Sequence, residues 1–208
     1  VHEDIKLGKP TRDKYIANYI ENIRRVASIG VKVICYNFMP VFDWTRTNLH
    51  HQNADGSESL SFSFDDFKKL DPKNLHLPGW DESYTSEELT SLLDEYKNIS
   101  HEQLFDNLVY FLNKIIPVCD ELDVKMAIHP DDPPMDIFSL PRIISTEEDL
   151  DRLFDAVKST NNGLTFCTGS LGARKDNDLV KMADKYSRAN RIHFAHLRNI
   201  CYTDNNNS

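Results

Sequence analysis

The fold is decided by the stretch Lys125-Met-Ala-Ile-His-Pro-Asp-Asp-Pro-Pro134. Residues 126–128 form an apolar run that is too short for a helix and is typical of a buried strand. The prolines that follow prevent both a strand and a helix from continuing. The sequence therefore predicts a strand whose C-terminal tip carries His129 and which leads into a rigid acidic loop.

Three other stretches have the same strand-like character. Val31-Lys-Val-Ile-Cys-Tyr-Asn37 is a β-branched run of strand length, closed by Pro40. Gly163-Leu-Thr-Phe-Cys-Thr-Gly169 ends near Cys167, and Arg191-Ile-His-Phe-Ala-His-Leu-Arg198 ends near His196. We therefore expect four buried strands, spread over the whole chain.

Apolar residues at helical spacing separate these strands. We expect Ser100 with Gln103, and Ser145 with Glu148, to form capping boxes, and Pro117 to kink its helix. Glycines should end two of the helices, the first at Gly30 and the third at Gly163. We expect a loop over residues 168–175. The predicted helices cover residues 15–27, 104–116, 150–157 and 179–186.

Strands that alternate with helices predict parallel βαβ units and an α/β fold. No strand is followed by G-x-G-x-x-G or G-x-x-x-x-G-K-[ST], which disfavours a Rossmann or P-loop site. A TIM (β/α)8 barrel is the better prediction. We expect residues 1–208 to cover roughly its central four or five βα units, with the other strands outside this sequence.

Residues 41–100 interrupt the alternation after the first predicted strand. Residues 47–52 and 59–64 flank Asp55-Gly56 and predict a hairpin, and Leu89 to Tyr96 predict a short helix. Asp71-Pro72 and Pro78-Gly79 mark turns between them. We expect an inserted unit that forms a lid or the contacts of a homo-oligomer, although a solvated excursion is equally consistent with the pattern.

Composition indicates a single soluble domain in the cytoplasm. The 208 residues are 40% hydrophobic and 27% charged, with no 18-residue apolar run and no signal peptide. The net charge of −9 disfavours nucleic acid as a partner, and we expect no membrane partner. The cysteines form no C-x-x-C pair and no disulfide framework, so we expect buried or ligating thiols in a reducing compartment; they are Cys35, Cys119, Cys167 and Cys201.

His129, Cys167 and His196 stand at three successive strand tips and predict a metal site. Each separation along the chain matches one βα unit. A lone histidine or cysteine at a strand end is more often structural, so the argument depends on all three. His193 competes with His196, but alternation puts the two on opposite faces of the strand. A thiolate with two imidazoles suits zinc, iron or manganese.

A catalytic site would need a fourth ligand, and a carboxylate is the expected type. None of Asp131, Asp132 and Asp136 is clearly placed for this role by the sequence.

Arginines follow three of the predicted strands on the same side of the fold. Arg46, Arg174 and Arg198 predict a seat for a carboxylate, because guanidinium groups bind carboxylates bidentately. Surface ion pairs are an equal alternative for any one of them. Asn37, Asp43 and Trp44, with Tyr36, follow the first strand and are candidates for binding substrate hydroxyls.

The chain contains several long, irregular strings: Val1-His-Glu-Asp-Ile-Lys-Leu-Gly8, Cys35-Tyr-Asn-Phe-Met-Pro-Val-Phe-Asp-Trp-Thr-Arg-Thr47, Met126-Ala-Ile-His-Pro-Asp-Asp-Pro-Pro134, Phe166-Cys-Thr-Gly-Ser170 and His193-Phe-Ala-His-Leu-Arg198. Together they resemble the D-mannonate dehydratase family, and the likeness covers nearly the whole chain. The resemblance implies a TIM barrel of the xylose-isomerase-like group with bound Mn²⁺ or Fe²⁺. It also implies dehydration of the sugar acid D-mannonate to 2-keto-3-deoxy-D-gluconate in hexuronate breakdown.

Carried over by motif, the resemblance makes His129, Cys167 and His196 the metal ligands. The family's aspartate ligand and its acid–base histidine and tyrosine are then expected beyond Ser208, so no catalytic residue is assigned. Two alternatives stay open: a metal-dependent sugar isomerase or epimerase of the same barrel group, and a binding domain in which the metal is only structural.

Overall fold

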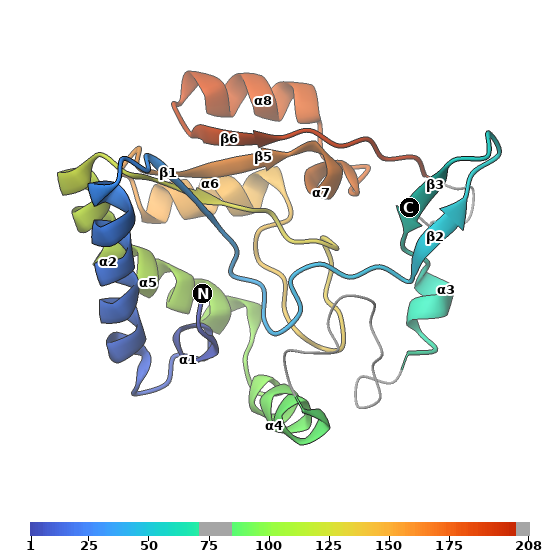
Figure 1. Ribbon diagram of the computed structural model, residues 1–208, viewed down its shortest axis with the longest axis horizontal. Coiled ribbons are helices and arrows are strands. Elements are labelled where there is room, and N and C mark those ends of the chain that lie inside the picture. Colours follow the sequence, from blue (N-terminus) through green and yellow to red (C-terminus); the bar gives the residue numbers. More distant parts are fainter. Residues whose placement is uncertain (71–84, 203–208) are drawn as a thin grey trace.

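A parallel sheet with helices packed against it organises the chain in the computed structural model, which describes residues 1–70 and 85–202. The sheet has four strands in the order β1-β4-β5-β6, so each new strand is added beside the previous one (Figure 1). The strands are β1 (Val33–Tyr36), β4 (Lys125–Ile128), β5 (Asn162–Cys167) and β6 (Ile192–His196). The predicted α/β class with parallel βαβ units is confirmed.

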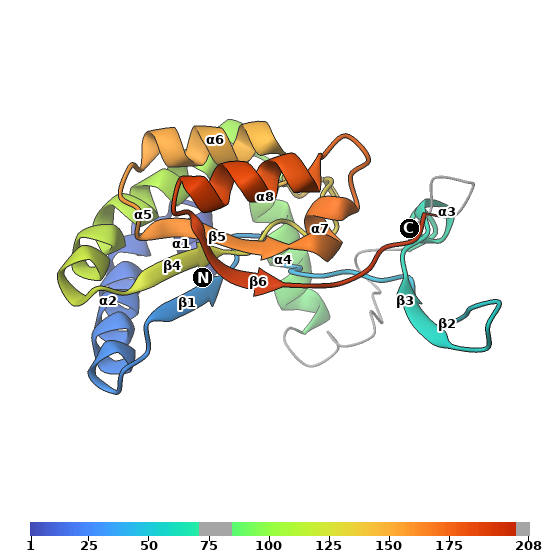
Figure 2. The same ribbon diagram turned by 90° about the horizontal axis from the view of Figure 1, so that it is seen from above.

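Long helices connect the strands and cover one side of the sheet. Figure 2 shows α5, α6 and α8 on that side, and α2 packs against α5. Their bounds are α2 (Arg12–Ser28), α5 (His101–Leu122), α6 (Glu147–Ala156) and α8 (Leu179–Arg188). Short helices complete the described chain: α1 (Glu3–Lys6), α3 (Phe64–Phe67), α4 (Ser86–Tyr96) and α7 (Thr168–Gly172). None of the described helices is long and apolar enough to cross a membrane.

The core lies between this helical layer and the sheet. Leu108, Phe111 and Leu112 of α5 are completely buried, as are Met126 and Ile128 of β4. Burying each such side chain contributes about 1.5–3 kcal/mol to folding. The apolar spacing that predicted the helix over residues 104–116 therefore corresponds to the face that α5 turns toward the sheet.

The sheet is strongly curled. Cys35 Sγ of β1 lies 3.0 Å from Thr165 Oγ1 of β5, although β4 runs between these two strands. Next-nearest strands of a flat sheet are about 9–10 Å apart, too far for such a contact between short side chains. The concave face therefore brings side chains of alternate strands together.

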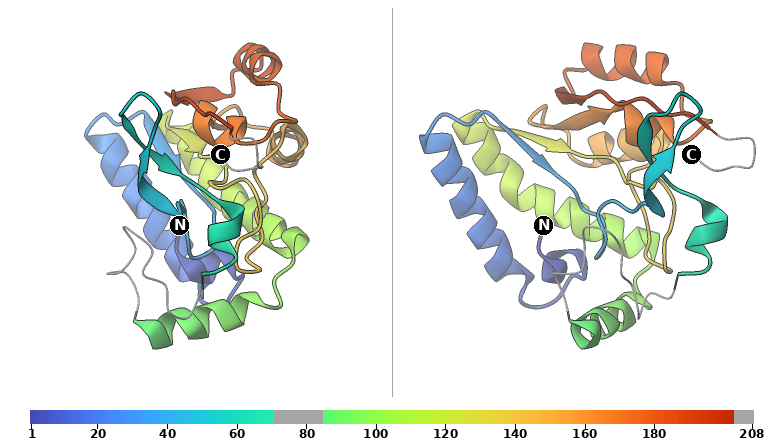
Figure 3. Two further views of the ribbon diagram at one scale, coloured as in Figure 1. Left: turned by 90° about the vertical axis from the view of Figure 1, so that its right-hand side faces the viewer. Right: turned by 45° about the vertical axis from the view of Figure 1, so that its right-hand side comes forward.

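The predicted hairpin is present as β2 (Asn48–Gln52) and β3 (Glu58–Ser61), which pair antiparallel. Figures 1 and 3 show it on the side of the molecule toward which the arrows of β5 and β6 point. Phe62 is buried at its base, with its ring centroid 5.4 Å from that of Phe67, and Phe67 lies 4.6 Å from Phe138 in the loop after β4. These rings attach the hairpin to the loop that follows His129. The turns predicted at Asp71-Pro72 and Pro78-Gly79 lie outside the described residues.

One local prediction about a helix end is wrong. The capping box at Ser100 and Gln103 is confirmed, but that of α6 uses Thr146 and Asp149, one residue later than predicted. Ser145 instead donates its hydroxyl to a buried carboxylate, that of Asp131, so it is not available as a cap. Pro117 lies within α5, which continues to Leu122, and the kink expected there stays a prediction.

Three predicted segment boundaries are also wrong. Gly163 lies inside β5 instead of ending a helix. A glycine is needed there because atoms of the neighbouring strand leave no space for a side chain. The loop predicted over residues 168–175 contains α7, and the strand predicted over residues 59–64 stops at Ser61, since Ser63 caps α3.

All four cysteines are free thiols. Cys119 and Cys167 are buried as predicted, whereas Cys35 and Cys201 are exposed, so the prediction of burial is wrong for these two.

Replacing Gly163 with Ala should destabilise the fold. A Cβ at this position would stand 2.2 Å from the His193 ring and 2.4 Å from the Arg191 carbonyl oxygen. The ring can move, but the carbonyl accepts the Leu164 N–H that joins β5 to β6. We expect the free energy of unfolding to fall by about 1–3 kcal/mol, measured by urea denaturation.

Gly172→Ala is the matched control, because its Cβ would meet only the flexible end of Leu179, at 3.3 Å. Equal stability of the two variants would show that β5 and β6 do not approach as closely as described.

Candidate metal centre

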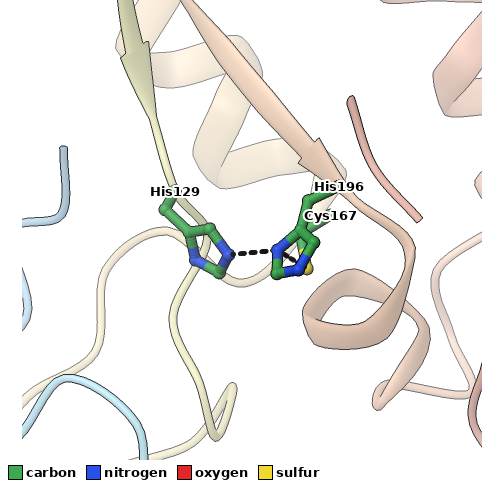
Figure 4. A group of neighbouring side chains, drawn as sticks. All are labelled: His129, Cys167 and His196. Carbon is green, nitrogen blue, oxygen red and sulfur yellow. Dashed lines mark hydrogen bonds between the residues drawn. The ribbon is translucent and has the colours of Figure 1, made fainter. Parts of the chain in front are cut away.

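The three predicted ligands meet at the C-terminal edge of the sheet. His129 follows β4, Cys167 ends β5 and His196 ends β6 (Figure 4). Because the strands are parallel, their ends lie at one edge, and the curl turns the side chains toward a common point. His129 Nε2 is 3.4 Å from His196 Nδ1, and Cys167 Sγ is 3.5 Å from the same nitrogen. All three ligand atoms lie within 4.8 Å of one another.

The loop after β4 orients the His129 ring. Its Nδ1 lies 2.7 Å from the Pro130 carbonyl oxygen, which can only accept a hydrogen bond, so Nδ1 carries the proton. Nε2, the ring nitrogen left to bind a metal, then faces His196. Metal-binding histidines are commonly held in this way, with the second ring nitrogen donating to a carbonyl or carboxylate.

Cys167 is poised as a thiolate. Its side chain is buried, and Sγ accepts the Ser170 N–H at 3.4 Å. Burial opposes ionisation of the thiol, but hydrogen bonds with His129 and Ser170 outweigh it and lower the pKa of Cys167 to about 6. By contrast, burial raises the pKa of Cys119 to about 12. At neutral pH, Cys167 therefore offers a charged sulfur to a cation.

His193 lies outside this group, as the alternation along its strand predicts. Its Nε2 donates to the Thr160 carbonyl at 2.8 Å, at the opposite end of the strand from His196.

A cavity of about 410 Å³ opens beside the three ligands. It is lined by two of the ligands and by most of the residues that the sequence proposes for substrate binding. Its lining contains Tyr36, Asn37, Asp43, Trp44, Arg46, His129, His196 and Arg198.

Arg174 is the exception among the predicted substrate residues. It does not line the cavity, and its guanidinium pairs with Asp176, with Nε 3.0 Å from Oδ1. The sequence was interpreted as a loop here, but α7 follows β5 directly and carries the chain away from the strand tips before Arg174 is reached. A position after a strand was therefore not sufficient to place a side chain at the site.

Asp132 is a residue of the site whose role the sequence did not reveal. Its carboxylate is only 5% exposed and accepts two bonds from Arg46, at 2.7 and 3.0 Å, and one from Arg198, at 2.8 Å. Burial raises its pKa, but the two arginines outweigh burial and hold the pKa below its usual value. The available signal was the combination of a rigid acidic loop with arginines after neighbouring strands.

The other two aspartates of this loop have different surroundings. Asp131 Oδ2 accepts the Ile144 N–H at 2.7 Å, and burial raises the pKa of this carboxyl. Asp136 contacts His101 at 2.8 Å, near the surface. Across residues 1–70 and 85–202, the candidate ligand group contains no carboxylate.

Cys35, Met39 and Leu60 also line the cavity and were not predicted to do so. Leu60 belongs to β3, on the same side of that strand as the buried Phe62. The alternation of serine with apolar residues was visible in the sequence, but the position of the hairpin was not.

Comparisons with known proteins point to one family. The family model for D-mannonate dehydratase (UxuA) matches residues 1–208. A mannonate dehydratase of Thermotoga petrophila is 52% identical over 214 residues, which cover 98% of this chain and 59% of that protein. Mannonate dehydratase 2 of Halalkalibacterium halodurans is 54% identical over 202 residues, covering 96% of this chain and 59% of the relative.

A solved structure is similar as well. The crystal structure of mannonate dehydratase from Streptococcus suis serotype2 aligns with a TM-score of 0.87 and 48% identity, over 96% of this chain and 54% of that one. The chain thus spans little more than half the length of the relatives that it matches. On the family match and on identities near 50% over almost all of its length, the chain belongs to the D-mannonate dehydratase (UxuA) family.

Proposed function

We propose that the protein is a metal-dependent dehydratase that converts D-mannonate to 2-keto-3-deoxy-D-gluconate in hexuronate breakdown. Family membership supports this substrate. The observation that carries the proposal is the convergence of His129, Cys167 and His196 beside a cavity that two arginines also line. The first group suits a cation, and the second suits the carboxylate of a sugar acid.

We propose a TIM (β/α)8 barrel as the complete fold, with residues 1–208 as part of it and residues 41–100 as an insertion. Parallel strands in sequential order support this proposal, as does the contact between Cys35 and Thr165, because inward side chains of alternate strands share a layer in such barrels. The position of the candidate ligands at the C-terminal strand ends agrees with the usual place of barrel active sites.

The donor set fits a transition-metal ion. Atoms that share an ion at about 2.0–2.3 Å stand about 3–4 Å apart, and the two shortest separations here, 3.4 and 3.5 Å, have this spacing. We propose that His129, Cys167 and His196 hold Mn²⁺ or Fe²⁺, since imidazole and thiolate exclude the harder Mg²⁺ and Ca²⁺. When bound, the ion supplies a Lewis acid that stabilises negative charge on substrate oxygens.

The arginines of the cavity suit the other end of the substrate. We propose that Arg46 and Arg198 orient the carboxylate, because both guanidinium groups line the cavity and guanidinium binds carboxylates through paired N–H groups. Asn37 and Asp43, whose side chains lie 3.5 Å apart, are placed to hydrogen-bond sugar hydroxyls. Trp44 is 36% exposed and forms a wall of the cavity.

Dehydration requires a base that removes the proton beside the carboxylate and an acid that protonates the departing hydroxyl. We propose that these groups, and a carboxylate ligand, lie in the part of the fold that the relatives have and this chain does not cover.

The proposal is tested by incubating the protein, expressed with any residues that flank this chain in its natural polypeptide, with D-mannonate and Mn²⁺. We expect a 2-keto-3-deoxy acid, detected by its reaction with periodate and thiobarbiturate. Isomerisation of aldoses with no loss of water from mannonate would instead establish a sugar isomerase of the same barrel group.

Replacing Cys167 with Ala should abolish metal retention, because its thiolate is the only anionic donor in the described ligand group. Elemental analysis after gel filtration measures the bound manganese and iron. Cys201→Ala is the matched control, since Cys201 is an exposed free thiol and does not belong to the group. Equal metal content in both variants would remove Cys167 from the site.

Replacing Arg46 with Gln should raise the KM for mannonate about 10- to 100-fold, because a hydrogen bond to a charged group contributes about 1.5–3 kcal/mol. Arg174→Gln should change KM less than about fivefold, since its partner is a surface aspartate. Steady-state kinetics of both variants measure the difference. A larger effect at Arg174 than at Arg46 would contradict the proposed carboxylate seat.

A further inference from the structure

One nitrogen of Arg198 contacts both a proposed metal ligand, Cys167, and a buried carboxylate, that of Asp132. This nitrogen, Nη2, lies 3.4 Å from Cys167 Sγ, 2.8 Å from Asp132 Oδ2 and 2.9 Å from Ser170 Oγ. The guanidinium therefore supports the sulfur of a proposed ligand while it is itself held by a buried carboxylate.

The absence of a side chain at Gly169 makes room for this guanidinium. A Cβ on Gly169 would stand 2.4 Å from Arg198 Nε and 2.8 Å from its Cζ. Ser170 reinforces the arrangement, because its hydroxyl donates to Asp132 Oδ2 at 3.1 Å. The Arg198 guanidinium thus occupies the space that a side chain at position 169 would need.

The same carboxylate holds a second arginine on its other side. Arg46 donates Nη1 to Asp132 Oδ1 and Nη2 to Oδ2, and its guanidinium lies 5.9 Å from the centroid of the Trp44 ring. Both Arg46 and Trp44 line the cavity. Two guanidinium groups this close would repel each other without an anion between them.

We infer that Asp132 is a positioning residue that couples the metal centre to the substrate cavity, by holding Arg198 against the Cys167 sulfur and Arg46 at the cavity wall. The inference rests on the proposed function, because it takes Cys167 as a metal ligand. Asp132 makes no hydrogen bond to the three ligand side chains, and it acts on the Cys167 sulfur through Arg198. Partners of ligands at this distance commonly change metal affinity about 10- to 100-fold when they are removed.

Asp131 provides a matched control in the adjacent position. It is 3% exposed, against 5% for Asp132, so the two carboxyls are equally buried. Its Oδ2 is bonded to the Ile144 N–H and the Ser145 hydroxyl, on the side of the loop that leads to α6. Replacing either aspartate would disturb the loop after β4. Only replacement of Asp132 would also remove the partner of Arg46 and Arg198.

The test compares Asp132→Asn with Asp131→Asn in the protein with its natural flanking residues. Asparagine keeps the size of the side chain and removes its charge. Calorimetry measures the Kd for Mn²⁺, and the absorption of the Co²⁺-loaded protein measures thiolate-to-metal charge transfer from Cys167. We expect Asp132→Asn to raise the Kd about 10-fold or more and to shift the charge-transfer band, and Asp131→Asn to change the Kd less than about threefold.

An unchanged Kd and band in Asp132→Asn would overturn the inference, as would equal losses in both variants. If Asp132→Asn does not fold, Arg198→Lys replaces it, because lysine keeps the charge but cannot bridge carboxylate and sulfur as a planar fork does. A shifted band in Arg198→Lys supports the inference, and an unchanged band overturns it.

These measurements use no sugar acid. A protein that shows the expected metal affinities but leaves mannonate intact would therefore refute the proposed reaction and not the coupling. If the unsubstituted protein dehydrates mannonate and the Asp132→Asn variant binds Mn²⁺ with unchanged Kd, the proposed role of Asp132 is refuted and the proposed reaction is not.

Discussion

Curvature of the four-stranded sheet is the constraint on which the candidate site depends. Parallel pairing aligns the strand ends at one edge, but in a flat sheet the side chains after β4 and β6 would stand two strand spacings apart, about 9–10 Å. The curl closes this distance, so that the rings of His129 and His196 approach each other and Cys167 lies beside His196. The contact between Cys35 and Thr165 one layer below reports the same curvature. The packing of the helices on the convex side thus has a direct chemical consequence at the strand tips.

Two arginines of the cavity share one buried carboxylate as their partner. The chain carries a net charge of −9, yet two arginines, Arg46 and Arg198, line the cavity. Buried or partly buried ions need partners because desolvation penalises them, and Asp132 supplies one partner for both. The arrangement places two guanidinium groups and two carboxylates, those of Asp43 and Asp132, around the cavity, next to a thiolate and two imidazoles. It suits the sugar acid that we propose as substrate.

Local sequence patterns predicted most of the elements and failed where a neighbouring segment changed the outcome. The apolar spacing of α5 and α8 and the turn at Asp55-Gly56 are local signals, and they gave the correct elements. The cap of α6 was misplaced because the Ser145 hydroxyl donates to Asp131, which lies 14 residues earlier in the chain and outside the helical pattern. Gly163 was interpreted as a helix terminator, whereas the close approach of β6 is the reason for a glycine there. Such contacts between distant segments leave no periodic trace in the sequence.

The sequence by itself determined the fold class, the family resemblance and the identity of the three candidate ligands, because strand tips at βα spacing are a property of the chain's order. Only the tertiary structure decided that Arg46 and Arg198 face the cavity while Arg174 does not, and that Asp132 stands between the first two. The physical reason is that a strand fixes where its last residue emerges, whereas a loop or an unpredicted helix such as α7 decides the direction of every residue after it. Side chains on these connections find their partners by packing and charge, which act through space and not along the sequence.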